Sequence, residues 1–161
     1  MRLRQVVFGT VIVALIVSGV RMVEAQAAAN SAKGSFTVSG KTYPLTHAAA
    51  FVDASDSRKP VILVLTDKAL PAKALSTSSV LSLERSTNPF SGIALWLDDT
   101  QTVFRAEYYE NGESTATSGV FALKLSSPPG KTLAGAIQTG AAAASVKNIP
   151  TTNVTFSATL K

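Results

Sequence analysis

The sequence predicts an all-β protein: an antiparallel β-sandwich or a small closed β-barrel of about eight strands, with one short helix near residues 71–75 and a cleaved N-terminal signal peptide. Two observations predict this fold class. Segments in which apolar and polar residues alternate recur along the chain, and a period of two is typical of half-buried strands. Short turns containing Gly, Asn or Pro separate these segments, which favours antiparallel pairing of consecutive strands.

The first 25 residues have the pattern of a secretory signal peptide. Two arginines precede an uncharged apolar run over residues 6–20, and small residues that suit cleavage follow it. We therefore expect residues 1–25 to be removed and the protein to be periplasmic or secreted. The alternative is an uncleaved membrane anchor, but the run is shorter than the ~20 apolar residues that span a bilayer. Residues 26–34 are expected to be a flexible leader, and residues 35–161 a single β domain.

The domain begins with a predicted hairpin over residues 35–43, because its central Ser-Gly pair supplies the positive φ that a two-residue turn needs. Pro44 then marks a bend or an edge position. Residues 45–52 alternate strictly and predict a strand. Residues 61–66 (VILVLT) are apolar on both faces, which is typical of a central, buried strand.

A short helix is predicted over residues 71–75, because Pro71 suits the first turn of a helix. Residues 76–84 are ambiguous, since their serines and threonine weaken a helix. Residues 93–97 alternate again and predict a strand. The Asp-Asp pair that follows predicts a turn, because Asp side chains bind nearby backbone N–H groups.

Residues 102–110 are the next predicted strand. Its alternation divides the side chains between two faces, with Phe104, Ala106 and Tyr108 on one and Val103, Arg105, Glu107 and Tyr109 on the other. The Asn-Gly pair at residues 111–112 is the strongest hairpin signal in the chain. The last predicted strands are at residues 120–125, 133–137 and 153–160.

Five blocks in this order resemble a family of small secreted bacterial proteins of uncharacterised function: GSFTVSGK (34–41), LTHAAAF (45–51), VILVLTDKALP (61–71), SGIALWLD (91–98) and VTFSA (154–158). The resemblance covers most of residues 34–160. It implies a secreted β-rich domain and supplies no activity and no site residue. Two places depart from the family pattern, which has an aromatic residue at Ala49 and a more aromatic segment at residues 141–144. A binding surface built from those aromatic residues would be weakened here.

The composition excludes several classes of function. The chain has no cysteine, which excludes disulfide scaffolds, thiolate chemistry and Cys-ligated metals. Residues 1–25 hold three arginines and one glutamate, so without them the net charge falls from +5 to +3. Scattered charge of this size does not form the basic stripe that binds nucleic acid. We expect no cofactor, no metal and no nucleic-acid partner.

Four residues are candidate contacts with a ligand or partner: His47, Trp96, Tyr108 and Tyr109. His47 is the only histidine, and we interpret it as a packed residue, with a general base as the alternative. A base needs a carboxylate to orient it, which would come from Asp53, Asp56 or Glu107. Alternation turns one of the two tyrosines outward, and it places Trp96 on the face opposite Leu95, where an exposed indole would be informative.

The predicted function is a non-catalytic, extracytoplasmic β domain that binds an envelope component or a protein partner. The first alternative is a carrier of a small apolar ligand, with the cargo in a cavity lined by phenylalanines, namely Phe36, Phe51, Phe104, Phe121 and Phe156. The second alternative is a hydrolase that uses His47.

Overall fold

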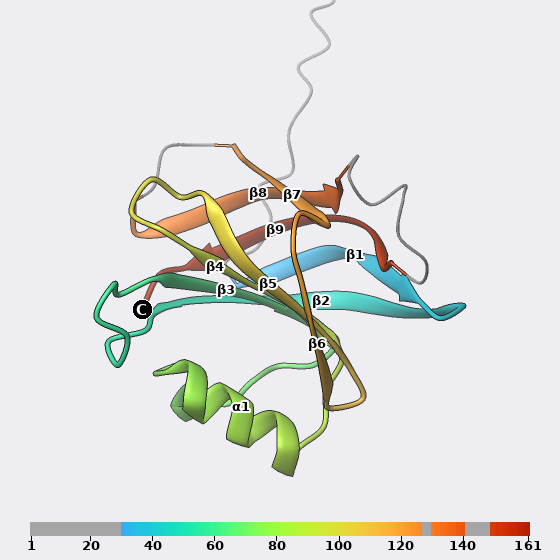
Figure 1. Cartoon of the computed structure of the whole chain (residues 1–161), viewed down its shortest axis with the longest axis horizontal. Helices are drawn as coiled ribbons and strands as arrows, with labels where there is room; N and C mark the ends of the chain where they lie inside the picture. Colours follow the sequence, from blue (N-terminus) through green and yellow to red (C-terminus); the bar gives the residue numbers. More distant parts are fainter. Residues whose placement is uncertain (1–29, 127–129, 141–148) are drawn as a thin grey trace, which may run out of the picture.

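The computed structural model describes residues 30–126, 130–140 and 149–161. They form one antiparallel sheet of nine strands in the order β6-β5-β4-β3-β2-β1-β9-β8-β7, with one 3₁₀ helix and one α-helix (Figure 1). The strands are β1 (Ser31–Val38), β2 (Lys41–Val52), β3 (Val61–Thr66), β4 (Gly92–Leu97), β5 (Val103–Glu110), β6 (Glu113–Thr117), β7 (Phe121–Leu125), β8 (Thr132–Thr139) and β9 (Thr151–Thr159). The helices are η1 (Ala72–Ala74) and α1 (Ser78–Thr87).

The sheet curls into a half-barrel with β6 and β7 at its two edges (Figure 1). The predicted β class and short helix are confirmed, whereas the sandwich and the closed barrel are wrong. Among the described residues, the two edge strands are not hydrogen-bonded to each other. The reason is physical: one-sided alternation is the same in a sandwich, a barrel and a curled open sheet, and closure depends on strand number and stagger instead.

Both faces of the central strands β3 and β4 are covered by apolar side chains. The concave face holds the inner core, a buried cluster that includes Leu63 and Leu95. The convex face of β3 and β4 holds the outer core, which includes Ile62, Val64 and the α1 residue Leu81. Strands β3 and β4 are therefore buried on both faces, which confirms the central strand predicted for the VILVLT segment.

Helix α1 lies against the convex face of the sheet (Figure 1). Thr77 caps the helix, since its side-chain oxygen accepts a hydrogen bond from the backbone N–H of Val80 at 3.2 Å. Leu81 packs into the outer core. Capping and tertiary packing thus stabilise a segment whose serines made its helicity ambiguous from sequence. The helix predicted at residues 71–75 is the three-residue η1.

Strand β1 begins at Ser31, so the last four residues of the predicted leader are part of the sheet. They pair with β9 from Ser31↔Ser157 to Gly34↔Val154, and β2 lies on the other side. Backbone hydrogen bonds to β9 and β2 order this segment, and Ala32 alone packs against the inner core. Its small and polar composition indicated flexibility because strand pairing leaves no signal in composition.

The Asn-Gly hairpin is confirmed: Asn111 and Gly112 have φ of 50° and 88° and join β5 to β6. The sequence does not predict β6 as a strand, because its five residues, ESTAT, contain no apolar alternation and are mostly exposed. Pairing with β5 over Glu110↔Glu113 to Ala106↔Thr117 forms the strand instead.

Some predictions concern residues outside the described ranges, namely the signal peptide at residues 1–25, the start of the leader and the alanine segment at residues 141–144. Within the part of the chain that the structure describes, no helix is both long enough and apolar enough to cross a membrane.

Candidate functional site

A β-bulge in β5 turns Phe104 out of the inner core. The register between β4 and β5 moves from Trp96↔Arg105 to Leu97↔Val103, so Phe104 is an extra residue without a partner on β4. Val103 packs against the inner core, while Phe104 is 41 % exposed. The prediction that Val103 faces away from Ala106 is therefore wrong, because both pack against the inner core and the bulge interrupts the alternation on which the prediction rested.

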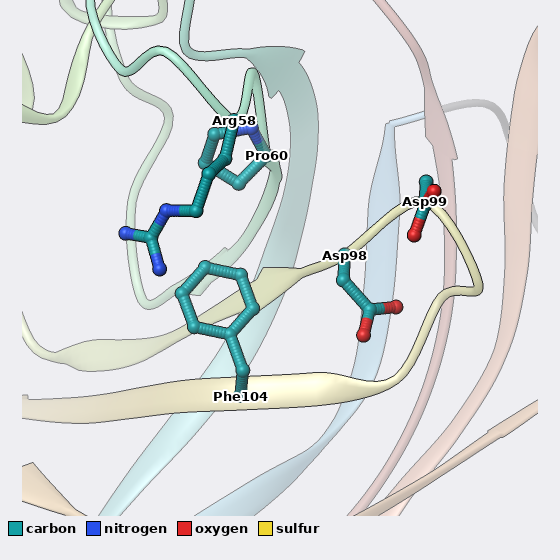
Figure 2. Close-up of a pocket in the computed structure, with 5 residues that line it drawn as sticks. All are labelled: Arg58, Pro60, Asp98, Asp99 and Phe104. Carbon is teal, nitrogen blue, oxygen red and sulfur yellow. The ribbon is translucent and has the colours of Figure 1, made fainter.

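Phe104 lies in an open hollow of about 470 Å³ between two loops, which we call the Phe104 hollow. The β2–β3 loop contributes Arg58 and Pro60, and the β4–β5 loop contributes Asp98 and Asp99. Figure 2 shows the ring of Phe104 beneath Arg58 and Pro60, with Asp98 beside it. Apolar and charged groups thus meet at one end of the half-barrel.

The cation in the Phe104 hollow is already neutralised. Arg58 forms an ion pair with Asp56 at 2.9 Å, and its guanidinium carbon lies 4.8 Å from the centre of the Phe104 ring. The side-chain and backbone hydrogen bonds from Arg58 lower the pKa of Asp56. Arg58 is therefore held over the ring by both a carboxylate and a cation–π contact.

The carboxylates of Asp98 and Asp99 have no cationic partner among the described residues. Asp98 accepts hydrogen bonds from the Thr100 hydroxyl at 2.7 Å and from the Thr102 N–H at 2.8 Å. These bonds lower its pKa, so that it stays ionised. Asp99 has no hydrogen-bond partner within the described part of the chain, and it is exposed. The hollow therefore has an excess of negative charge.

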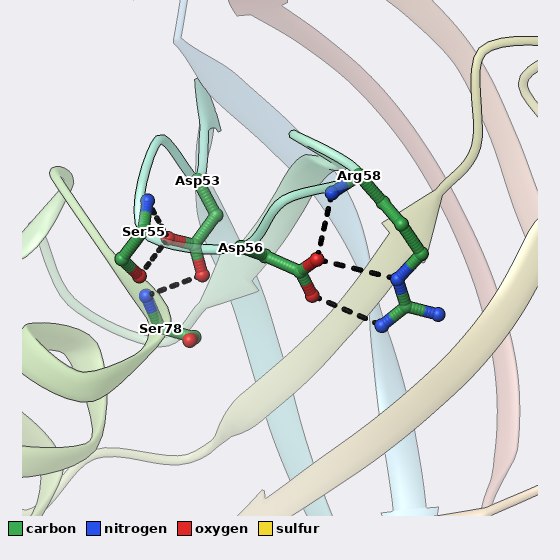
Figure 3. A network of polar contacts seen from close by, with 5 residues as sticks. All are labelled: Asp53, Ser55, Asp56, Arg58 and Ser78. Carbon is green, nitrogen blue, oxygen red and sulfur yellow. Dashed lines mark hydrogen bonds and ion pairs between the residues drawn. The ribbon is translucent and has the colours of Figure 1, made fainter.

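The β2–β3 loop that holds Arg58 is anchored by Asp53, which is 1 % exposed. One carboxylate oxygen accepts from the backbone and hydroxyl of Ser55, at 3.1 and 2.5 Å, and the other accepts from the Ser78 N–H of α1 at 3.0 Å (Figure 3). Asp53 thereby joins the loop to the helix. Its burial raises its pKa, but the hydrogen bonds from Ser55 and Ser78 outweigh burial and lower it.

Two of the sequence-predicted contact residues, Trp96 and Tyr109, lie together in the outer core and are only 5 % and 3 % exposed. Trp96 points to the face of the sheet opposite Leu95, as predicted, but side chains of other elements cover it there. Arg105 lies 4.6 Å from the Trp96 ring, and Phe90 packs edge-on against Tyr109 at 5.4 Å. Alternation along one strand does not reveal which residues, distant in the sequence, cover its side chains.

Tyr108 and His47 lie apart from that pair. Tyr108 is half-buried against the inner core. His47 is half-buried in β2, opposite Thr66 of β3, and its Nδ1 is 2.9 Å from the Thr46 hydroxyl. Among the described residues, no carboxylate is hydrogen-bonded to the imidazole. Asp53 and Asp56 bind Ser55 and Arg58 instead, and Glu107 binds Arg105.

The five phenylalanines expected to line one cavity are divided between different places. Phe36, Phe121 and Phe156 belong to the inner core, and Phe51 belongs to the outer core on the opposite face of the sheet. Phe104 is exposed. The sequence places all five on strands correctly but cannot assign them to a face, because β2 and β5 do not keep one alternation throughout: Leu45 lies in the inner core and Phe51 in the outer core.

His47→Ala is expected to lower the free energy of unfolding by about 1 kcal/mol, because it removes the contact with Thr46 and the packing of a half-buried ring. Ligand or partner binding should be unchanged. Thermal denaturation measures the change in stability, and a binding assay measures the affinity for the ligand or partner. Unchanged melting combined with lost binding would show that His47 is a contact residue.

Comparison of the chain with protein-family models, with curated proteins and with solved structures finds no match. Within residues 30–126, 130–140 and 149–161, no three His, Asp or Glu side chains gather as a metal site would require. The candidate site therefore rests on geometry. The sequence contains no signal for Phe104 as a surface residue, because a bulge depends on the register of two paired strands.

Proposed function

We propose that the protein is a non-catalytic binding domain of the extracytoplasmic space, and that the Phe104 hollow is its contact surface for a protein partner. The N-terminal segment supports the location, since its pattern is that of a signal peptide. The observation that supports the surface is the bulge that exposes Phe104. A single exposed apolar residue is ordinary, but bulges are over-represented where a side chain is re-aimed for a function.

The chemistry of the hollow favours a partner segment with one apolar and one basic side chain. Phe104 and Pro60 offer an apolar surface, while Asp98 and Asp99 offer two carboxylates that no cation of the described residues neutralises. A lysine or arginine of the partner can lay its aliphatic stem on apolar surface and place its charge beside a carboxylate. Aromatic anchors in hollows of this kind dominate many interfaces.

Phe104→Ser is expected to remove partner binding while lowering the free energy of unfolding by only about 1 kcal/mol, because the ring is 41 % exposed and loses chiefly its contact with Arg58. Asp99→Lys should weaken binding through charge repulsion and leave stability unchanged. Circular dichroism melting curves separate the two effects. A large loss of stability in Phe104→Ser would mean that the ring is part of the core.

The partner is found by placing the photo-crosslinking residue benzoylphenylalanine at position 104 in the native host. Position 83 is the matched control, because Leu83 is also a large exposed apolar residue, 63 % exposed, but lies on α1. We expect one discrete crosslinked species from position 104 and none from position 83, with the yield reduced by Asp99→Lys. Equal yields from both positions, or none from either, would refute the proposed surface.

A further inference from the structure

A second hollow lies on the convex side, between α1 and the outer face of β4, β5 and β6; we call it the α1 cleft. Its volume is about 280 Å³. Helix α1 contributes Ser79 and Arg85, and the sheet contributes Trp96, Arg105, Glu107 and Tyr109. Unlike the Phe104 hollow, this cleft has two arginines and one carboxylate at its walls.

Each arginine is fixed against an aromatic ring. Arg105 lies 4.6 Å from the centre of the Trp96 ring and donates from Nε to Glu107 at 3.2 Å, with a second, shorter bond from Nη2. Arg85 lies 5.5 Å from the centre of the Tyr109 ring and donates to the Gly112 carbonyl. Stacking and bonding hold both guanidinium planes, so little side-chain entropy is left to lose when a ligand binds.

The charged groups meet around the Tyr109 hydroxyl. Burial raises the pKa of Tyr109, the charge of Glu107 raises it further, and the charges of Arg85 and Arg105 lower it. All three charged groups are therefore close to the same phenol. Because the phenol stays protonated, the cleft has two cations and one anion, which leaves an excess of one positive charge.

Several hydrogen-bond donors in the cleft have no partner within the described residues. A guanidinium has five N–H groups, and Arg105 uses only Nε and Nη2 on Glu107. The hydroxyls of Ser79 and Ser114, which also line the cleft, have no hydrogen-bond partner among residues 30–126, 130–140 and 149–161. Charged N–H groups form their strongest hydrogen bonds with carboxylate or phosphate oxygens.

The N-terminus of α1 is not the source of this attraction. The Ser78 N–H donates to Asp53, and the Val80 N–H donates to Thr77. Two of the first three backbone N–H groups, which commonly hold an anion at a helix start, are therefore already occupied. The anion would be held by side chains, chiefly by the guanidinium groups.

We infer that the α1 cleft binds a sugar-sized, hydroxylated anion, that is, a sugar bearing a carboxylate or a phosphate. The anionic group would pair with Arg105 and Arg85, while Glu107 would accept, and the serine hydroxyls would exchange, hydrogen bonds with the sugar hydroxyls. The size follows from the volume, since pockets for drug-sized ligands are about 300–1,000 Å³ and this one, at about 280 Å³, is just below that range. The site is independent of the Phe104 hollow.

Trp96 provides the probe, because it is the only tryptophan of the chain and lies in the cleft wall. Its fluorescence and its single indole N–H resonance are followed while glucuronate, glucose 6-phosphate, glucose or inorganic phosphate is added to the mature protein. We expect saturable changes with the two charged sugars and none with glucose. Equal binding of glucose, binding of inorganic phosphate as tight as that of glucose 6-phosphate, or no change with any probe would each overturn the inference.

Arg105→Gln is expected to weaken the binding of the charged sugars about tenfold or more, and Arg105→Lys to weaken it less, since it keeps the charge but loses the planar fork. Lys73→Gln on η1 is the matched control: it removes the same charge outside the cleft and should leave binding unchanged. The affinities are read from backbone amide resonances, because the Arg105 variants alter the surroundings of Trp96. Equal weakening by Arg105→Gln and Lys73→Gln would refute a specific site.

Discussion

Gly112→Val is expected to lower the free energy of unfolding by about 3–4 kcal/mol, which corresponds to a fall in melting temperature of about 10 °C or more. Two costs add. Gly112 has a φ of 88°, which a β-branched residue resists. A Cβ at this position would also lie 3.0 Å from the Pro89 Cβ and 3.1 Å from the Arg85 carbonyl oxygen. An added side chain therefore has no room unless the β5–β6 hairpin moves away from α1 and the segment after it.

Gly40→Val is the matched control, since Gly40 occupies the same place in the β1–β2 hairpin, with a φ of 77° and no atom within 4 Å of an added Cβ. It should cost about 1–2 kcal/mol from backbone strain alone. Chemical denaturation of both variants measures the difference. Equal losses would show that packing at Gly112 contributes nothing, and an unchanged Gly112→Val protein would refute the turn itself.

Asp53→Ala is expected to lower the free energy of unfolding by about 3 kcal/mol at pH 7, because it leaves the donors of Ser55 and Ser78 unpaired in a buried place. The loss should be localised. Relative to wild type, hydrogen exchange of the backbone amides should accelerate more in α1 and the β2–β3 loop than in β3. An equal change in exchange rate in all three elements would contradict a role for Asp53 in joining the loop to the helix.

The contribution of Asp53 should depend on pH in one direction. The pKa of Asp53 is lowered in the folded state, so below the unfolded value of about 3.9 the unfolded state binds more protons. The stabilisation is complete above that pH and is lost as the pH falls through the folded pKa. Denaturation of wild type and Asp53→Asn between pH 7 and pH 2 should give curves that converge in acid.

Much of the fold could be predicted because its causes are local. The VILVLT segment is apolar on both faces and forms β3, and the Asn-Gly pair forms the turn between β5 and β6. Strand β6 and helix α1 were not predicted. Pairing with β5 stabilises β6, and packing of Leu81 into the outer core stabilises α1. Neither segment has a local pattern strong enough to indicate its structure.

The candidate sites could be predicted only in part. Trp96 and Tyr109 were predicted to contact a ligand or partner, which stays a prediction, and they line the α1 cleft. Phe104 was predicted only as part of the cavity lining of the carrier alternative, and Arg58 was not predicted as part of any site. Their contact joins the β2–β3 loop to a bulge in β5, and alternation along one strand contains no information about such a pair.

The sequence by itself determined the β class, the central strand and the main turn, because backbone propensity and alternation act over a few residues. Only the tertiary structure decided that the sheet stays open as a half-barrel, that Phe104 faces solvent and that Arg85 and Arg105 meet in one cleft. These features depend on the register between strands and on contacts between distant segments. Register and distant contacts result from the packing of the whole sheet, so no short stretch of sequence specifies them.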